Sequence, residues 1–174
     1  MTKQLIGLAG LTACLLVAPG CGSKHEVQTI EEAPRLASTV RMNDPAVVHQ
    51  LVSGFHDVEG RAWRWTARAF AVDLRPPDRA AQVGAVLEFH FSIPKTSMDK
   101  LGSMTLKAAI GGTALPSETY TNPGDYTYRR DVSPTLLAGD SVRVDFDLDK
   151  AVPPGDVDKR ELGVVAASVA LVAK

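Results

Sequence analysis

The chain of 174 residues carries 19 Lys and Arg against 20 Asp and Glu, and it has two cysteines. This length allows one domain with a hydrophobic core of its own. The near-neutral charge argues against a nucleic-acid-binding protein, which needs a concentrated basic face. Cys14 and Cys21 both lie near the N-terminus, so the rest of the chain can form no disulfide, no thiolate nucleophile and no cysteine-ligated zinc site.

The N-terminal segment has the order of a secretory leader. Lys3 supplies a positive charge, residues 5–17 form an apolar stretch, and the small residues 18–20 lead into Cys21. The apolar stretch is shorter than the roughly 20 residues that a helix needs to cross a bilayer. The segment resembles the lipobox of bacterial lipoproteins, in which the leader is cut before a cysteine whose thiol is diacylated. The resemblance implies a signal peptide over 1–20 and a membrane lipid anchor at Cys21.

Two alternatives remain open for this leader. The motif LTAC at 11–14 is a closer match to the lipobox than the residues before Cys21, where Ala18 stands in place of the usual Leu or Val. Lipidation at Cys14 would, however, shorten the apolar core to about seven residues, the lower limit for such a segment. The other alternative is an ordinary or uncleaved signal sequence.

Residues 22–43 mix charged and small residues without any period, which predicts a flexible tether. The expected organisation is therefore a signal peptide over 1–20, a lipidated cysteine and tether over 21–44, and a folded domain over 45–174. Asp44 and Pro45 are typical of a helix N-cap and first turn, and the apolar residues of 47–52 would share one helix face up to Gly54. An extended segment that ends at 54–55 is nearly as consistent with these residues.

The segment GFHDVEGRAWRWT at 54–66 combines aromatic and charged residues. Trp63 and Trp65 are both tryptophans of the chain, and on a strand they share one face, with Arg64 on the other. Indole rings beside polar groups are typical of sugar sites, because pyranose C–H faces stack on indole while hydroxyls take hydrogen bonds. The candidate ligand-binding residues are therefore Trp63, Arg64, Trp65, His56 and Glu59. The alternative interpretation is that the tryptophans anchor the sheet packing, with Glu59 and Arg64 paired nearby.

From residue 63 onward, apolar residues alternate with polar ones, which predicts half-buried strands. Three series are expected to face the core: Leu87, Phe89, Phe91 and Ile93; Met104, Leu106, Ala108 and Ile110; and Val142, Val144, Phe146 and Leu148. Segment 162–172 has apolar residues at both its odd and its even positions, which predicts a strand covered on both faces. Turn signals at 75–78, 111–112, 122–125, 138–140 and 153–156 separate these strands, and 99–101 fits one helical turn. The predicted fold class is all-β, a single antiparallel β-sandwich or jelly roll.

Other patterns carry little chemistry. Asp145, Asp147 and Asp149 alternate with apolar residues, which is typical of a solvated strand face and not of a calcium loop. The four histidines lack zinc-site spacing, no serine lies in a nucleophile elbow, and only proximity marks Asp57 and Glu59 as a hydrolase pair. The tyrosines at 126 and 128 would widen an aromatic platform, although a hairpin that packs its own turn fits them better. We expect no enzyme activity, no catalytic residue, no metal and no cofactor.

Three segments together are similar to a β-sandwich module of Acidobacteria and related bacteria: GFHDVEGRAWRWT, LGSMTLKAAIGGTALPSETYTNPGDYTYRRDV and DKRELGVVAASVAL. The resemblance spans about residues 45–173. In that family such modules occur in lipoproteins of unassigned role, and similar ones are appended to glycosyltransferases. The resemblance implies a non-catalytic, jelly-roll-like module in a cell-envelope or glycan context, and it assigns no catalytic residues.

Two functions are compatible with these observations. In the first, a lipid-anchored, non-catalytic protein uses its β-sandwich to bind a glycan or another envelope component through the face of Trp63 and Trp65 or through the loops. In the second, a structural or assembly lipoprotein docks a protein partner and binds no small ligand. Both place the protein in the cell envelope, anchored to a bacterial membrane through acylated Cys21, with the periplasmic or surface side of the outer membrane favoured. The exposure of the two indoles distinguishes them.

Overall fold

The computed structural model describes residues 35–174, so the leader, Cys21 and the first part of the predicted tether lie outside the described residues. The elements follow in this order: β1 (Thr39–Arg41), the 3₁₀ helix η1 (Pro45–Gln50), β2 (Leu51–Glu59), β3 (Trp63–Leu74), α1 (Ala80–Val83), β4 (Ala85–Ile93), α2 (Lys95–Leu101), β5 (Met104–Ile110), β6 (Thr113–Tyr120), β7 (Gly124–Val132), the 3₁₀ helix η2 (Pro134–Leu136), β8 (Val142–Leu148) and β9 (Val165–Ala173). Every strand pair among them is antiparallel. The predicted all-β antiparallel fold is confirmed.

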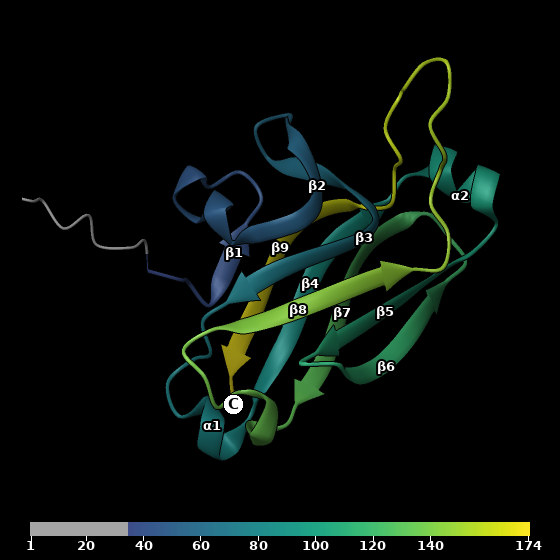
Figure 1. Cartoon of the computed structure of the whole chain (residues 1–174). Coiled ribbons are helices and arrows are strands. Elements are labelled where there is room, and N and C mark those ends of the chain that lie inside the picture. The colour runs from purple at the N-terminus through teal and green to yellow at the C-terminus, as the bar shows by residue number, and fades with distance from the viewer. Residues whose placement is uncertain (1–34) are drawn as a thin grey trace, which may run out of the picture. The chain divides into compact units, whose positions relative to one another are not determined.

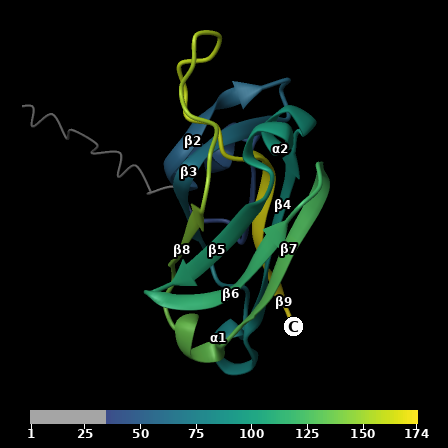
Figure 2. The ribbon, with the colours of Figure 1, turned by 90° about the vertical axis from the view of Figure 1, so that its right-hand side faces the viewer.

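The strands form one sheet that folds back on itself into two layers. Its order is β6-β5-β8-β3-β9-β4-β7, with β1 added to β9 and β2 added to β3. In Figure 1 the strands β3, β8, β5 and β6 lie in front of β9, β4 and β7. Figure 2 shows the layers from the side, with β3 and β8 in one and β4, β7 and β9 in the other. Because β3 belongs to both layers, the outer surface of the sheet continues from one layer to the next.

The junction between the layers lies where β3 changes partner. Residues 69–74 of β3 pair with β8, whereas Arg64 and Trp65 pair with Ala166 and Val165 of β9. Gly163 makes this close approach sterically acceptable, since a Cβ at that position would lie 2.7 Å from the carbonyl oxygen of Ala67. A glycine before β9 is therefore a condition for closing the two layers.

The seam between β6 and β7 is closed by side chains and not by a backbone ladder. The hydroxyl of Tyr128 and Nε of Arg130 both donate to the carbonyl oxygen of Pro116 at 2.7 Å, and Nη2 of Arg130 pairs with Glu118 at 2.7 Å. Proline on β6 removes an edge N–H group that another strand would otherwise pair with.

The core lies between the layers and is made of the alternating residues that the sequence predicts. Every side chain of the three series in β4, β5 and β8 is at most 6% exposed, so these predictions are confirmed. Phe70 of β3 completes the centre, because its ring stacks on Phe146 at a centroid distance of 4.9 Å and also contacts Phe89 at 5.5 Å. Aromatic pairs at these distances add to the free energy gained by burying their surface.

The N-terminal elements differ from the expected boundary. β1 pairs with β9, Val40 and Met42 are buried in the core, and the carbonyl oxygen of Ala37 accepts from the backbone N–H of Arg75 at 3.1 Å. The folded unit therefore begins before residue 45, where the sequence analysis expects the tether to end.

The predicted helix after Asp44 forms, but it is short. Asp44 caps η1 by accepting from the N–H of Ala46 at 2.9 Å. The helix ends at Gln50, whose buried side-chain amide bonds the backbone of Ala37. The chain then continues as strand β2, which runs through Gly54, so the helix does not extend to Gly54. The helical turn expected at 99–101 is confirmed as the end of α2.

One further expectation is corrected, and one is confirmed. β9 is not covered on both faces, because Ala167 is exposed and Val172 is 38% exposed on the outer side of the sheet. The tyrosines of β7 do not widen an outer platform: Tyr128 is fully buried, and Tyr126 donates to the carbonyl oxygen of Asn122 at 2.8 Å, so the hairpin packs its own turn as the sequence favours. Small apolar residues tolerate a solvated sheet face, so apolar residues at both odd and even positions of β9 do not show that both of its faces are covered.

Within residues 35–174, no helix is long and apolar enough to cross a membrane. No group of three or more His, Cys, Asp or Glu side chains in the same part of the chain is arranged to hold a metal ion.

Candidate ligand-binding face

The two tryptophans lie at the start of β3 on the outer surface of the sheet. Trp65 pairs with Val165 on that surface, whereas the alternate residue Ala166 of β9 points into the core. The two rings meet edge to face, with a centroid distance of 6.3 Å and an interplanar angle of 85°. Both indoles are half-buried, and the hydrophobic core of the described domain includes neither of them. The indoles therefore lie on the outer surface of the sheet and pack against each other there.

A tight hairpin between β2 and β3 sets the position of the first indole. Gly60 and Arg61 have φ values of 56° and 55°, and the N–H of Ala62 donates to the carbonyl oxygen of Glu59 at 3.1 Å, which is the geometry of a type I′ turn. The turn brings Glu59 directly opposite Trp63, so both side chains project from the same face. A Cβ on Gly60 would lie 3.0 Å from Nε1 of Trp63, so the indole packs against the turn itself.

The long loop between β8 and β9 is tied to this hairpin by an ion cluster that the sequence analysis did not find. Nη1 of Arg160 donates to Oε1 of Glu59 at 2.6 Å, while Nε and Nη2 donate to the two carboxylate oxygens of Asp158 at 3.0 and 2.8 Å. All three side chains are about one third exposed. Hydrogen bonds from Arg160 lower the pKa of Asp158 to about 2. Glu59 and Arg160 are 101 residues apart, so no local spacing signals their contact.

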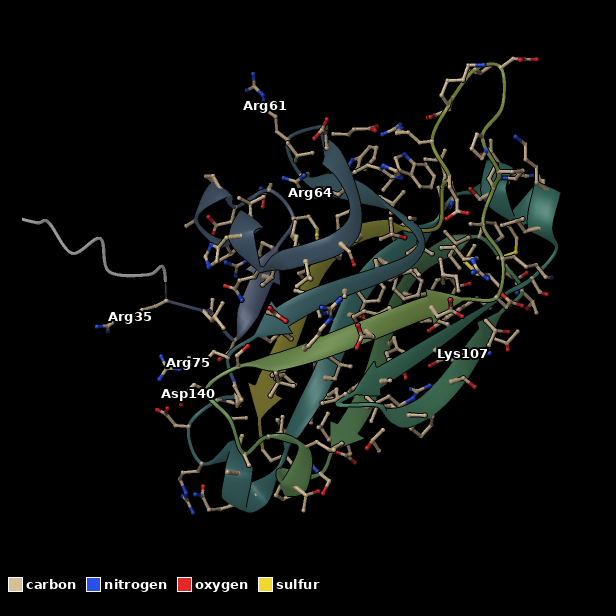
Figure 3. All side chains as sticks on the ribbon, in the orientation of Figure 1. Arg35, Arg61, Arg64, Arg75, Lys107 and Asp140 are labelled. Carbon is tan, nitrogen blue, oxygen red and sulfur yellow. The ribbon has the colours of Figure 1, made fainter. Side chains whose placement is uncertain are left out.

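Arg64 and His56 both donate hydrogen bonds to backbone carbonyl oxygens. Nε and Nη1 of Arg64 donate to the carbonyl oxygens of Met42 and His56, each at 2.9 Å. Nε2 of His56 donates to the carbonyl oxygen of Glu161 at 2.8 Å. These bonds join the end of β1, strand β2 and the β8–β9 loop, so both residues support the hairpin. Figure 3 shows Arg61 of the same hairpin pointing away from the domain.

The five candidate residues therefore separate into two groups. The structure brings Trp63, Trp65 and Glu59 together on one face, whereas Arg64 and His56 are engaged with carbonyl oxygens behind it. Glu59 pairs with Arg160 and not with Arg64.

A shallow cavity of about 240 Å³ opens on the same outer surface between β4 and β7. Two cross-strand pairs form its polar wall: the hydroxyl of Ser92 donates to Asp125, and the hydroxyl of Thr127 bonds Nδ1 of His90 at 2.9 Å. The sequence places these residues on two separate strands, and only the strand register shows that they meet.

No protein-family model matches the sequence, and no curated protein matches it. Among solved structures, the chain is similar to a carbohydrate-binding module, TmCBM27, described for its specific recognition of mannan. The two are 14% identical, with a TM-score of 0.47, and the likeness covers 80% of this chain and 97% of that chain. Membership of the Acidobacteria-type lipoprotein family stays a prediction.

Proposed function

We propose that this protein binds a carbohydrate on the outer surface around Trp63 and Trp65, without catalysing a reaction. The observation that carries the proposal is the pair of half-buried indoles held edge to face outside the core. Large aromatic rings gain most free energy by burial, and two that remain partly exposed offer an apolar surface to a ligand. The C–H face of a pyranose ring is such a ligand surface.

Polar groups beside the indoles supply the hydrogen bonds that sugar hydroxyls require. Arg160 has five N–H donors, and the bonds to Glu59 and Asp158 described above use three of them. Oε2 of Glu59 is an acceptor on the same edge, next to Trp63 in register. Donors and acceptors fixed beside an aromatic surface are the usual composition of a carbohydrate site.

A glycan array with the full chain tests this function. Trp65→Ala removes one indole from the surface, and we expect binding to weaken at least tenfold, or about 1.4 kcal/mol, as for an aromatic residue at the centre of a binding surface. Trp65→Phe keeps an aromatic face and should retain part of the affinity. Val172→Ala, on the opposite end of the same sheet surface, is the control and should bind normally.

The array and the variants also distinguish carbohydrate binding from the second function, in which the domain docks a protein partner and binds no small ligand. If no glycan on the array binds, the carbohydrate proposal is wrong. Glycan binding that survives both Trp63→Ala and Trp65→Ala would equally contradict it, because the indoles would then lie outside the site.

We also propose that the domain is held in the cell envelope by a lipid on Cys21. This proposal rests on the sequence of the leader, which lies outside the described residues. Cys21→Ser should abolish metabolic labelling with a fatty acid and release the protein from membranes. Unchanged labelling of that variant would assign the lipid to Cys14 instead.

A further inference from the structure

We infer that the ligand of the proposed site is a neutral oligosaccharide that crosses the strands from Trp65 to the cavity between β4 and β7. This inference rests on the proposed carbohydrate function and adds the length, course and charge of the ligand. It draws on the strand register, which links the tryptophans to a second set of polar residues on the same surface.

The register places four residues in one row across four strands. Trp65 of β3 pairs with Val165 of β9, Val165 pairs with Ser92 of β4, and Ser92 pairs with Asp125 of β7. Directly paired residues project from the same face of a sheet, so the whole row faces outward. Three spacings between strands amount to about 14 Å, which is longer than one sugar ring.

The surface between the two ends of the row carries small side chains. A bulge in β9 places the exposed Ala167 beside Val165, and Ala167 forms part of the cavity lining. Small side chains there leave a path from the indoles to the cavity. A chain of sugars that stacks on Trp65 would therefore continue over β9 and place its next units at Ser92 and Asp125.

The cavity offers hydrogen bonds of both kinds at the far end of this path. Asp125 accepts from Ser92 with one oxygen, which leaves its second oxygen for a sugar hydroxyl. His90 bonds Thr127 through Nδ1, and its Nε2 lies 3.7 Å from the carboxylate of Glu88. Groups already held by partners lose little freedom when a ligand arrives.

The charges favour a neutral ligand over an acidic one. Among the residues that line the cavity, Asp125 carries the carboxylate, and no Lys or Arg is part of that lining. Glu88 next to the cavity is compensated by its ion pair with Arg129. Arg41 shares a row with His90 through Ser168, but its backbone lies two strands away, about 10 Å. An anionic sugar in the cavity would meet the Asp125 carboxylate, and no Lys or Arg of the cavity lining would compensate that charge.

Calorimetry with the full chain tests this course. The probes are neutral cello- and manno-oligosaccharides from monosaccharide to hexasaccharide, with oligogalacturonides as their anionic counterparts. We expect affinity to rise with chain length and the neutral series to bind more tightly. Asp125→Asn and Ser92→Ala should each weaken hexasaccharide binding about tenfold and leave disaccharide binding unchanged, because a disaccharide is held at the tryptophans alone.

Controls separate this inference from the proposed function. Asp145→Asn changes an exposed carboxylate on β8, in the other layer, and should leave all affinities unchanged. Thermal unfolding of each variant confirms that it is folded. If affinity does not depend on length, if both cavity variants bind the hexasaccharide normally, or if oligogalacturonides bind better, the inference is overturned. A loss with Trp65→Ala would still support the function. If no probe binds, the inference is overturned, and the glycan array decides the proposed function separately.

Discussion

Gly163 links the fold to the candidate face, and its replacement by alanine gives a stringent test. A Cβ at this position would lie 2.6 Å from Oγ1 of Thr66, 2.7 Å from the carbonyl oxygen of Ala67 and 2.7 Å from Cδ1 of Leu148. Ordinary contacts of a Cβ begin near 3.4 Å, so these atoms would have to move apart by about 0.7 Å. The Ala67 oxygen belongs to the backbone of β3 and cannot rotate away.

The expected cost follows from two effects. Forcing a methyl group into a packed site costs about 1–3 kcal/mol. The hydroxyl of Thr66 is fully buried and accepts from the N–H of Val164 at 3.1 Å, so displacing it adds the cost of a strained buried hydrogen bond. We therefore expect Gly163→Ala to lower the free energy of unfolding by about 2–4 kcal/mol. For a domain of this size, the melting temperature would fall by roughly 8–16 °C.

Urea unfolding followed by tryptophan fluorescence and circular dichroism measures the effect. Gly155→Ala is the matched control, because a Cβ there meets no atom within 4 Å. That variant should be neutral or slightly more stable, since alanine restricts the unfolded chain more than glycine does. If Gly163→Ala is as stable as Gly155→Ala, the close approach of β9 to β3 is not as described, and the position of Trp65 in the proposed row falls with it.

Two further results are expected. Arg61→Gly should raise the free energy of unfolding by about 0.5–1 kcal/mol in urea unfolding, because φ is 55° at this turn position, a conformation that a side chain disfavours; lower stability would show that the arginine side chain makes a needed contact. Because the pKa of Asp158 is lowered to about 2, its bonds to Arg160 should persist above about pH 4 and be lost as pH falls toward 2. The NMR shift of the Arg160 amide, which donates to Asp158, should report this midpoint and stay flat in Asp158→Asn, while a midpoint near 4 would contradict the pairing.

Local patterns account for much of the fold. Alternation in β4, β5 and β8 predicts which residues face the core, since each strand buries one face whatever its neighbours are. The Asp44 cap and the turn of Tyr126 also follow from short-range chemistry. These features depend on residues a few positions apart, so the sequence carries them directly.

The candidate face shows where local patterns end. The sequence indicates that Trp63 and Trp65 share a strand face, but not whether that face is core or surface, because indoles are used in both places. Glu59 meets Arg160 across 101 residues, and Trp65 reaches the row of Asp125 only through β9 and β4. In each case a register between distant strands decides which side chains become neighbours.

The sequence by itself therefore determines an all-β domain with alternating strands, a tryptophan pair on one strand face, and a leader that predicts a lipid anchor at Cys21. Only the tertiary structure decides that the indoles lie outside the core, that Arg160 and not Arg64 pairs with Glu59, and that polar residues of β4 and β7 continue the same surface. The physical reason is that a strand's pattern specifies its two faces, whereas pairing and layer closure, set here at Gly163, determine what each face meets.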